Sequence, residues 1–566
     1  MKKRWRVNPA NKELQDALGR ELNILPVTAQ LLINRGLVDK DTALSFLSPD
    51  INALIDPFLL KGMDKAVTRI AEAVGKKERI AIYGDYDVDG TTATAVLGLF
   101  FKEIGVEPLC YIPERKSEGY GLNEGALREL KEKGASLVIT VDCGSSNSKE
   151  VAFAKTLGLD CIVTDHHEVP SDVSAIEYLV NPMQEGCTYP FKGLCGAGVA
   201  FHLAIAIRTR LRERGMLTVV PNLKRYLDLV AIGTIADMVS LTGVNRVLVS
   251  HGLKELETTG RAGLRALKDV AGLRPGRVNA EAVAFQIAPR INAAGRMERA
   301  DTALRLLITD DEAEASEIAR KLNAINIERQ AVEAAILGEA IEMLGPNPAD
   351  RAIVLASKSW NQGVVGIVAS RLVEKFGRPA VLAAIDGDIA KGSVRGVKGV
   401  NVLDGLTACA DKLVRYGGHK AAAGITVEAA MFDAFKASYL EYMNSHITDD
   451  DLTPEVTLDC VVPLSDVNAR MVTELERLAP FGRANERPLF CIEGARVMQS
   501  DLVRDKHLKL VLKQSGRTQS AIAYKMGTMH PVGGLYDVAF FPYIDNWNGN
   551  SSVCLNVKDL RPSERA

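Results

Sequence analysis

Short apolar segments alternate with longer amphipathic ones over residues 78–240. Five of the apolar segments read RIAIYG, PLCYIP, SLVITVD, LDCIVTD and IEYLVNP. Short apolar runs of this kind are typical of strands buried on both faces of a parallel sheet, and the stretches between them predict crossover helices. The pattern therefore predicts a parallel-sheet α/β domain.

The rest of the chain has three further patterns. Residues 1–75 look helical and carry no obvious chemistry. A helical pattern extends from Asp311 to Leu344, where GPNP ends it, and its length favours a connecting helix. A second, glycine-rich α/β unit follows at about 350–445, and alternating strands such as HLKLVLK and SAIAYKM predict a small β-barrel from about residue 452. We expect an α/β domain with a helical extension at 1–305, a connecting helix at 306–346, a second α/β domain at 347–447 and a barrel at 448–566.

Composition narrows the class of protein. The chain has 566 residues, with 69 Lys and Arg against 71 Asp and Glu, so nucleic-acid binding would depend on local concentrations of positive charge. Its nine cysteines form no C-x-x-C pair, which indicates a reducing compartment and disfavours a thiolate zinc site. The start, MKKRWRVNPANKELQ, lacks the apolar stretch of a signal peptide, and no run approaches the ~20 apolar residues of a membrane span. These features predict a cytoplasmic protein that does not enter a membrane.

The segment IYGDYDVDGTTA raises the first question of chemistry. Asp85, Asp87 and Asp89 stand at spacing two and are followed by Gly90. Carboxylates crowded in this way repel one another unless a cation lies among them. The pattern D-x-D-x-D-G also begins a calcium-binding EF-hand loop, but position twelve would be Val96 instead of Glu, and a strand precedes the loop instead of a helix. The calcium loop is therefore disfavoured.

Two more predicted strands end in residues that bind metals. SLVITVD ends at Asp142, and LDCIVTD ends at Asp165, followed by His166 and His167. Any one of them alone is readily explained as a helix cap or turn residue, but independent caps do not explain so many at the ligand-binding edge of one sheet. Carboxylates with some imidazole and no thiolate suit Mn²⁺ or Mg²⁺, and two ions about 4 Å apart would suit phosphoester hydrolysis.

At GDYDVDG and TDHH the chain resembles the DHH phosphoesterase superfamily, named for the triplet present here as Asp165-His166-His167. Within it, the chain resembles the RecJ family of bacterial single-strand-specific 5′-to-3′ DNA exonucleases. The blocks IPERKSEGYGL, VAIGTIADMVSL, RINAAGR, WNQGVVGIVASRL, GSVRG and YGGHKAAAG carry this resemblance, in the expected order. It implies a DHH domain, a DHH-associated domain in the second α/β unit and, from FGRANERPLF onwards, an OB-like (oligonucleotide-binding) barrel.

The resemblance also implies the residues of the metal site. The ligands would be Asp87, Asp89, Asp142, His166 and Asp237. His167 would face the scissile phosphate, and Asp85 would be a further acidic contributor, so that all seven residues form the catalytic set. One position departs from the superfamily pattern: Tyr83 stands where related members carry a metal-binding His. The second ion is then held more loosely, or by Asp85.

Other residues are candidates for binding the substrate. Arg115, Arg296, Arg371 and Arg395 offer planar forks to phosphate oxygens, with surface salt bridges as the alternative. Ser393, Gly418 and His419 add donors on a tight backbone, and WNQGVVGIVASRL predicts a helix N-terminus suited to an anion. The aromatic residues of the tail are candidates for base stacking, although barrel core is expected for at least half of them: Phe540, Phe541, Tyr543 and Trp547.

The resemblance implies a metal-dependent exonuclease that hydrolyses single-stranded DNA from the 5′ end to mononucleotides, in DNA repair and recombination. Its cofactor would be Mn²⁺ or Mg²⁺ at two sites. Its partners would be single-stranded DNA, with a helicase and a single-strand-binding protein as further candidates. The alternative is another DHH phosphoesterase acting on short oligonucleotides or nucleotide phosphates, but such enzymes resemble only the first two domains. A catalytically silent nucleic-acid-binding relative is disfavoured because this chain keeps its acidic residues.

Overall fold

The computed structural model describes residues 3–115, 117–346, 348–529, 533–546 and 551–564. By its contacts the chain forms two compact units. One comprises Met1–Trp5, Ala293–Arg299 and Arg320–Val456, and the other comprises Arg6–Asn292, Ala300–Ala319 and Thr457–Ala566. The domain limits at 305, 346 and 447 remain predictions.

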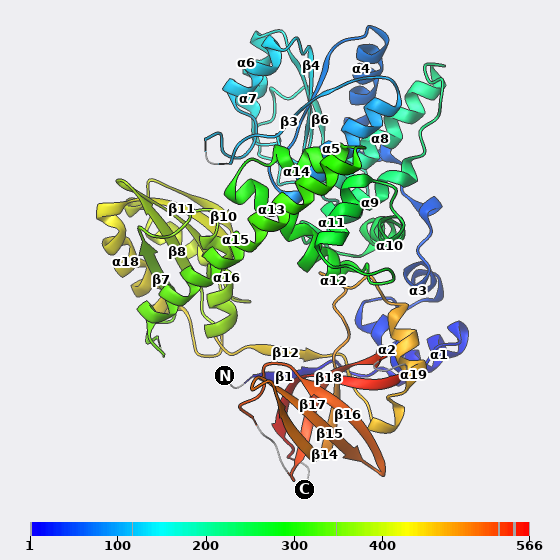
Figure 1. Cartoon of the computed structure of the whole chain (residues 1–566), viewed down its shortest axis with the longest axis vertical. Helices are drawn as coiled ribbons and strands as arrows, with labels where there is room; N and C mark the ends of the chain where they lie inside the picture. Colours follow the sequence, from blue (N-terminus) through cyan, green and yellow to red (C-terminus); the bar gives the residue numbers. More distant parts are fainter. Residues whose placement is uncertain (1–2, 116, 347, 530–532, 547–550, 565–566) are drawn as a thin grey trace. The chain divides into compact units, whose positions relative to one another are not determined.

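The first sheet is entirely parallel, as the sequence predicts. Its strands are β2 (Ile80–Tyr83), β3 (Leu109–Tyr111), β4 (Leu137–Val141), β5 (Asp160–Thr164) and β6 (Tyr178–Val180), in the order β3-β2-β4-β5-β6. One face is covered by α6 (Glu124–Glu132) and α7 (Ser148–Thr156), and the other by α4 (Met63–Gly75), α5 (Val88–Glu103) and α8 (Gly196–Glu213), as Figure 1 shows. The strand order reverses between β2 and β4, which is where open α/β sheets bind ligands.

Helices complete this half of the chain. They are α9 (Leu227–Ala236), α10 (Gly243–Glu257), α11 (Ala262–Val270), α12 (Ala280–Ala282), the π-helical segment η4 (Val283–Ile287), α13 (Ala288–Met297) and α14 (Asp301–Ile308). All ten residues of α9 except Ala236 are among its buried residues, and the helix contacts α5, α8 and α10. A helix that is apolar all round belongs inside a core. Its burial fixes the residue at its end, Asp237.

The long helix is present as predicted: α15 extends over 33 residues, Glu312–Leu344. The second sheet then forms from β7 (Ile353–Ser357), β8 (Ala380–Asp386), β9 (Ile389–Arg395), β10 (Arg415–His419) and β11 (Ala422–Glu428), in the order β10-β11-β9-β8-β7. Only the β7–β8 pair is parallel. One face packs on α16 (Val365–Phe376) and the other on α17 (Val402–Ala408) and α18 (Phe432–His446).

The tail is a closed barrel, as predicted. Strands β14 (Phe490–Val503), β15 (His507–Gln514), β16 (Arg517–Ala523), β18 (Ser552–Pro562) and β17 (Leu535–Asp545) pair in that order, and β17 pairs back onto β14. Register shifts in β14, and between Ala539 and Phe540, bend the strands as closure requires. The short strand β13 (Cys460–Val461) and helix α19 (Ala469–Glu476) precede the barrel.

The barrel shares its core with the beginning of the chain. Helices α1 (Lys12–Leu22), α2 (Pro26–Asn34) and α3 (Lys40–Leu47) contribute Leu18, Leu31 and Phe46 to the hydrophobic cluster that fills the barrel. The sequence predicts only helices here, but the edge segment RWRV forms β1 (Arg4–Val7) and pairs with β12 (Glu455–Leu458). Short 3₁₀ turns complete the fold at Ile51–Ala53, Pro57–Leu59, Leu223–Tyr226, Ala410–Lys412, Ala429–Met431 and Leu464–Asp466.

Two buried polar side chains tie these segments together. Glu474 of α19 accepts hydrogen bonds from Leu25 N (2.7 Å) and Thr28 Oγ1 (2.8 Å), and so caps α2, whose own N-cap residue has no side-chain acceptor. Arg246 of α10, only 2% exposed, donates to Phe46 O (2.7 Å) and Leu478 O (2.8 Å). It also donates to two neighbouring carbonyl groups, and its guanidinium lies 3.7 Å from the centre of the Phe46 ring.

We predict that Arg246→Met destabilises the protein, because it leaves several buried carbonyl groups without a donor. The free energy of unfolding should fall by about 3 kcal/mol or more. Arg246→Lys should recover only part of this loss, because an ammonium cannot reproduce the planar fork. Urea unfolding followed by circular dichroism measures both. Arg214→Met, at an exposed arginine after α8, is the matched control. An unchanged unfolding midpoint for Arg246→Met would contradict the assignment of this tie.

Candidate metal centre and phosphate-binding pocket

The three acidic residues of GDYDVDG lie between the end of β2 and the first turn of α5. Asp87 is the N-cap of α5 and accepts from Gly90 N at 3.0 Å. Asp89 lies inside the first turn. A Cβ on Gly90 would lie 2.5 Å from Asp85 N, so only glycine lets this turn close onto Asp85. The glycine that ends the motif is therefore required for the packing of its carboxylates.

Asp89 is held by the N-terminus of another helix. Its carboxylate accepts from Gly196 N (2.5 Å) and Ala197 N (2.9 Å) of α8, and the side chain is only 1% exposed. A helix N-terminus favours negative charge, so it stabilises Asp89 as a carboxylate. Glycine makes the room: a Cβ on Gly233 of α9 would lie 2.7 Å from Asp89 Oδ1, and one on Gly196 would lie 2.4 Å from Asp142 Cβ.

His166 lies among three carboxylates contributed by separate elements. Its Nε2 is 3.1 Å from Asp142 Oδ1, 3.7 Å from Asp237 Oδ2 and 3.9 Å from Asp89 Oδ2. Asp142 follows β4 with φ 64°, a left-handed conformation that a non-glycine residue adopts at some cost. Asp237 is the C-cap of α9. The structure thus brings these four predicted residues to one point.

His167 is oriented by two partners. Its Nδ1 lies 2.7 Å from Asp165 Oδ1 and 3.1 Å from the hydroxyl of Tyr120, which also donates to Asp142 O at 3.3 Å. Asp165 is 1% exposed and accepts from the backbone N–H groups of Ser145, His166 and His167. His166 therefore lies among the carboxylates of the cluster, whereas His167 is held in place by Asp165.

Burial and mutual repulsion shift the pKa values of this cluster. Burial, and then neighbouring carboxylates, raise the pKa of Asp85 and of Asp237 to about 8. Burial likewise raises the pKa of Asp89 and Asp142, and lowers that of His166. Each of these carboxyl shifts disfavours the ionised form, and a divalent ion bound here would favour it.

The pair beside them behaves in the opposite way. Burial lowers the pKa of His167, but the hydrogen bond to Asp165 and the surrounding carboxylates raise it to about 9. Burial raises the pKa of Asp165, but its bonds to His167 and to Ser145 N lower it to about 2. At neutral pH His167 is therefore a cation beside an ionised aspartate.

The residues present fit a pair of divalent ions. Ligand atoms lie within 4.8 Å of one another in three groups: Asp89, His166 and Asp237; Asp85, Asp87 and Asp142; and Asp142, His166 and His167. Three buried atoms of these groups have no hydrogen-bond partner among the described residues, namely Asp85 Oδ1, Asp142 Oδ1 and His166 Nε2. Buried polar atoms without partners are costly, and a cation would satisfy all three. The oxygen-rich set suits Mn²⁺ or Mg²⁺.

Tyr83 takes no part in these groups. Its hydroxyl donates to Gly121 O (2.9 Å) and accepts from Asn123 Nδ2 (3.2 Å), and its ring stacks on Tyr111 within the core beside β2. The position therefore serves packing. In the second group the carboxylates of Asp85, Asp87 and Asp142 stand together without it.

Of the predicted phosphate ligands, Arg115 lies beside the acidic cluster. Its guanidinium is 5.1 Å from the centre of the Tyr86 ring, and its charge lowers the pKa of Asp85 against the larger effect of burial. Tyr86 stands between Asp85 and Asp87 in the chain. Arg115 is therefore placed to reach a phosphate bound to cations at these carboxylates.

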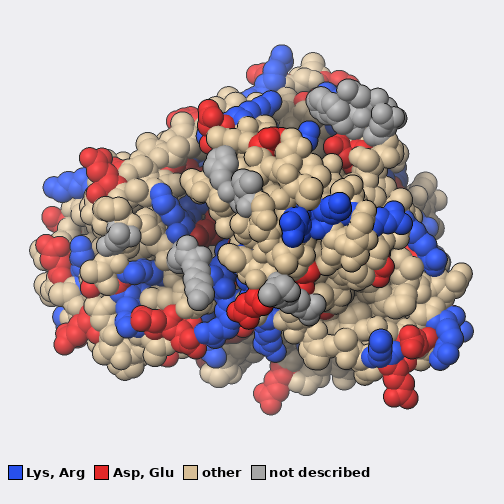
Figure 2. All heavy atoms as spheres, turned by 90° about the horizontal axis from the view of Figure 1, so that it is seen from below, with Lys and Arg blue, Asp and Glu red and all other residues tan. Residues whose placement is uncertain are grey.

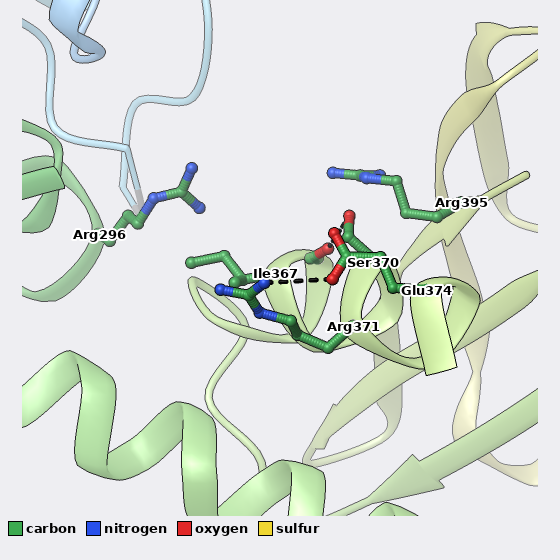
Figure 3. Close-up of a pocket in the computed structure, with 7 residues that line it drawn as sticks. Arg296, Ile367, Ser370, Arg371, Glu374 and Arg395 are labelled. Atoms are coloured by element: carbon green, nitrogen blue, oxygen red, sulfur yellow. Dashed lines mark hydrogen bonds and ion pairs between the residues drawn. The ribbon is translucent and has the colours of Figure 1, made fainter. Parts of the chain in front are cut away.

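The other three predicted arginines line one pocket in the unit that carries the second sheet. Figure 3 shows Arg296, Arg371 and Arg395 around a cavity of about 230 Å³, together with the first turns of α16. Helix α16 begins at Val365, as WNQGVVGIVASRL predicts. A Cβ on Gly366 would lie 3.0 Å from Ser393 Oγ and 3.1 Å from Arg395 NH2, so this glycine allows the helix to approach both side chains. The pocket combines a helix N-terminus with arginines, which suits an anion.

Arg371 is paired with two glutamates. It forms ion pairs with Glu333 (3.1 Å) and Glu374 (3.2 Å), the second of which is drawn in Figure 3. Glu374 itself lines the pocket. Arg371 thus lies in the pocket, as a phosphate ligand would, and also forms the salt bridges that were the alternative explanation for it.

Gly418 and His419 both lie on β10, which β11 separates from β9. His419 of β10 pairs with Ala422 of β11, which pairs with Arg395 of β9, so His419 and Arg395 are two strands apart, roughly 10 Å. Gly418 has φ 145°, and a Cβ there would lie 2.5 Å from Ala422 O. The predicted tight backbone is present.

Of the described tail aromatics, Phe540 belongs to the barrel core, and the expectation that at least half of the four do so stays a prediction. Phe540 is fully buried inside the barrel. Phe541 and Tyr543 are half-buried, and Arg487 and Lys558 lie over the Phe541 ring at 5.5 Å and 4.8 Å from its centre. Trp547 lies outside the described residues.

Three contributors escape the sequence analysis. Tyr120 lies in the block IPERKSEGYGL, in which the sequence singles out only Arg115 as a candidate site residue. Cys195, the N-cap of α8, lies beside Asp89 and is an ordinary buried cysteine by sequence. Arg483 contacts Met238 O at 3.3 Å across 245 residues, which no local pattern reveals.

No helix in the described part of the chain is long and apolar enough to cross a membrane.

Comparison with known proteins matches each of these parts. Family models match residues 79–234 (DHH family, N-terminal domain), 349–445 (DHHA1 domain) and 458–559 (RecJ OB domain). The single-stranded-DNA-specific exonuclease RecJ of Bacillus subtilis is 38% identical over 571 residues, which cover 100% of this chain and 71% of that protein.

Solved structures agree. The crystal structure of RecJ from Thermus thermophilus in complex with Mn²⁺ matches with a TM-score of 0.86 and 34% identity, over 99% of this chain and 80% of that one. The corresponding complex with Mg²⁺ matches with a TM-score of 0.81 and 33% identity, over 99% of this chain and 79% of that one. Identity above 30% along the whole sequence, together with all three family domains, shows that the chain belongs to the RecJ family of DHH phosphoesterases.

Proposed function

We propose that the protein is a metal-dependent exonuclease that hydrolyses single-stranded DNA from the 5′ end to mononucleotides, in DNA repair and recombination. The observation that carries the proposal is the joining of the acidic centre and the OB barrel in one compact unit. A hydrolase of small phosphate compounds has no need of a strand-binding barrel. The 5′-to-3′ direction and the release of mononucleotides rest on the family.

One divalent ion would be held by Asp89, His166 and Asp237, and a second by Asp85 and Asp87. Asp142 would lie near both ions. When bound, Mn²⁺ or Mg²⁺ supplies activation of the attacking water and stabilisation of the charge that develops on the phosphate. His167 keeps a proton at neutral pH, and since its Nδ1 faces Asp165, its Nε2 is the nitrogen that can donate to a phosphate or a leaving oxygen.

The pocket lined by Arg296 and Arg395, with Ser393 beside Gly366, would bind the terminal phosphate of the strand. Its volume of about 230 Å³ suits one phosphate with part of its sugar, and a helix N-terminus and two arginines are complementary to a dianion. Arg371 also lines this pocket, and Gly418 and His419 would border it. A grip on the terminus makes the enzyme an exonuclease, because an internal phosphodiester has no terminal group to offer.

Affinity for longer strands would come from a few basic and aromatic side chains at particular places on the surface. The chain has a formal net charge of −2, and Figure 2 shows Lys and Arg interspersed with Asp and Glu on the face displayed. Phe541, flanked by Arg487 and Lys558, is a candidate for base stacking on the barrel. Single-stranded DNA is thus the proposed partner. A helicase and a single-strand-binding protein are proposed as further partners that would supply and protect single strands. Because the substrate would come from chromosomal DNA, we propose that the protein acts in the cytoplasm.

The second candidate is a DHH phosphoesterase that acts on short oligonucleotides or nucleotide phosphates. The terminal pocket favours it, because a short substrate fills that pocket equally well. Chain length discriminates the two: the exonuclease should have a lower KM for a 20-nucleotide strand than for a dinucleotide, since the barrel contributes contacts only to the longer one.

We predict that Asp142→Asn abolishes hydrolysis without unfolding the protein. Asp142 is common to two groups of ligand atoms, so its loss should lower turnover with Mn²⁺ by more than about 100-fold, the scale reached by outer-shell partners alone. Mn²⁺ binding followed by calorimetry should weaken in parallel. The melting temperature should be unchanged or higher, because one of several repelling carboxylates is removed. The control is Asp172→Asn, at an exposed aspartate of the same domain. Near-normal turnover would refute the assignment.

Arg395→Gln should reduce the preference for a 5′-phosphate. On strands with a 5′-phosphate we expect kcat/KM to fall by about 10-fold, the scale of one charge-assisted hydrogen bond, whereas strands with a 5′-hydroxyl should be affected little. Rates on the two matched substrates measure this. Lys398→Gln, at a lysine with an 89% exposed side chain, is the control. Equal losses on both kinds of end would show that Arg395 has no role at the terminus.

End-labelled duplexes test the polarity. A 5′ overhang should be trimmed back to near its junction, whereas a 3′ overhang and a blunt duplex should be largely spared. The chain shows no nucleotide-binding G-x-x-x-x-G-K-[ST] loop with which to drive strand opening. Faster loss from the 3′ overhang, or rapid digestion of the blunt duplex, would overturn the proposed function.

A further inference from the structure

The turn Gly482–Asn485, between α19 and β14, contacts the segment that follows Asp237 of the metal centre. Arg483 O accepts from Leu241 N at 2.8 Å, and Arg483 NH1 donates to Met238 O at 3.3 Å. Met238 directly follows Asp237, whose carboxylate is one of the group around His166. The charge of Arg483 acts on Asp237, whose pKa it lowers against the larger effect of burial. An arginine from the segment that leads into the barrel therefore lies next to the residues that follow Asp237.

This turn is built to keep its shape. Gly482 and Asn485 pair with each other through both backbone hydrogen bonds, at 2.9 Å and 3.0 Å. Asn485, 1% exposed, donates to Leu478 O and Pro480 O at 2.8 Å each. A Cβ on Gly482 would lie 2.6 Å from Leu241 Cδ1, so the turn is in close contact with the segment that follows Asp237.

The first helices of the chain hold the turn from its other side. Arg35, at the end of α2, donates from Nε to Asn485 Oδ1 (2.7 Å) and from NH2 to Glu486 O (2.8 Å). The same arginine donates to Leu31 O of its own helix at 2.9 Å. A turn fixed on both sides holds the backbone of Arg483 in place before a ligand binds, so that only its side chain remains to be ordered.

The guanidinium of Arg483 forms few hydrogen bonds within the described part of the chain. Arg483 is exposed, and the contact with Met238 O is its one hydrogen bond from the side chain among the described residues. Five N–H donors are present in every arginine. Cations at the carboxylates would offset the attraction of Asp237 for Arg483, and the remaining donors would then be available to an anion beside the metal centre.

We propose that Arg483 is a substrate-binding residue that contacts a backbone phosphate next to the one being cleaved. The inference rests on the proposed function, and it adds to it a contact through which the segment leading into the OB barrel acts directly at the metal centre. A strand that extends from the metals toward the barrel passes this turn, and an arginine is well suited to a phosphate oxygen pair.

The test measures binding, so that it does not depend on turnover. Fluorescence anisotropy with Ca²⁺ in place of Mn²⁺ gives Kd for labelled 12-nucleotide single strands. Arg483→Gln should weaken binding by about 10-fold and reduce the salt slope of log Kd by about 0.7, the value for one phosphate contact to a single strand. Arg483→Lys should lie between the two. Arg477→Gln, at an exposed arginine six residues earlier in the chain, should bind like the wild type.

Methylphosphonate substitution identifies the phosphate. Strands carrying one neutral linkage are compared, with the linkage moved through the first four positions. At one position the wild type should lose about 10-fold in affinity, whereas Arg483→Gln should lose less than about 2-fold, because the two changes remove the same contact. Equal losses for both proteins at every position, or an unchanged Kd for Arg483→Gln, would overturn the proposal.

Two further readouts separate this contact from a merely structural one. The melting temperature and the calorimetric Kd for Mn²⁺ should be unchanged in Arg483→Gln, and KM should rise more than kcat falls. A lower melting temperature with weaker Mn²⁺ binding, and no rescue by lysine, would show that Arg483 only supports Asp237 and would refute the proposal. Absence of cleavage by the wild type would instead refute the proposed function, while the binding measurements would still decide the role of Arg483.

Discussion

The arrangement of the catalytic half depends on one constraint, the mutual repulsion of carboxylates at one edge of a parallel sheet. Asp85, Asp89 and Asp142 are nearly inaccessible to water, and burial together with their proximity raises their pKa values. Such a group is unfavourable on its own and becomes favourable only with cations in its midst. Divalent metal is thus part of the physical stability of this edge, and the chemistry follows from where the carboxylates are forced to stand.

The surrounding structure lowers the cost of this crowding. The N-terminus of α8 donates two N–H groups to Asp89, and glycines at positions 196 and 233 remove the side chains that would otherwise occupy the space of the carboxylates. The left-handed backbone at Asp142 is a further cost that the packed sheet must enforce. The imidazolium of His167 adds a positive charge held by Asp165. Helix dipole, glycine packing and a local ion pair therefore act together on the same few atoms.

The sequence predicts the parts of this site that are local. Strand ends place acid and imidazole at one edge because strands of a parallel sheet share a direction, so a reading of GDYDVDG, Asp142 and His166 suffices to bring them together. Contacts between distant segments leave no such trace. Nothing near Arg246 or Arg483 indicates that one ties α10 to residues 477–479 and the other touches the carbonyl of Met238. The displacement of Tyr83 into the core was likewise invisible, because its role depends on Gly121 and Asn123.

The barrel illustrates the same limit at the level of domains. Its strands are evident from alternation, and they suggest a module that could be removed from the chain. Yet its core is completed by Leu18, Leu31 and Phe46 from the first three helices, and Glu474 of α19 caps the second of these. Removing the barrel would expose these apolar faces and leave the turn at Arg483 without its frame, so a truncated chain would lose more than affinity for DNA. The contribution of the barrel to strand binding is therefore accessible only through surface substitutions that leave this shared core intact.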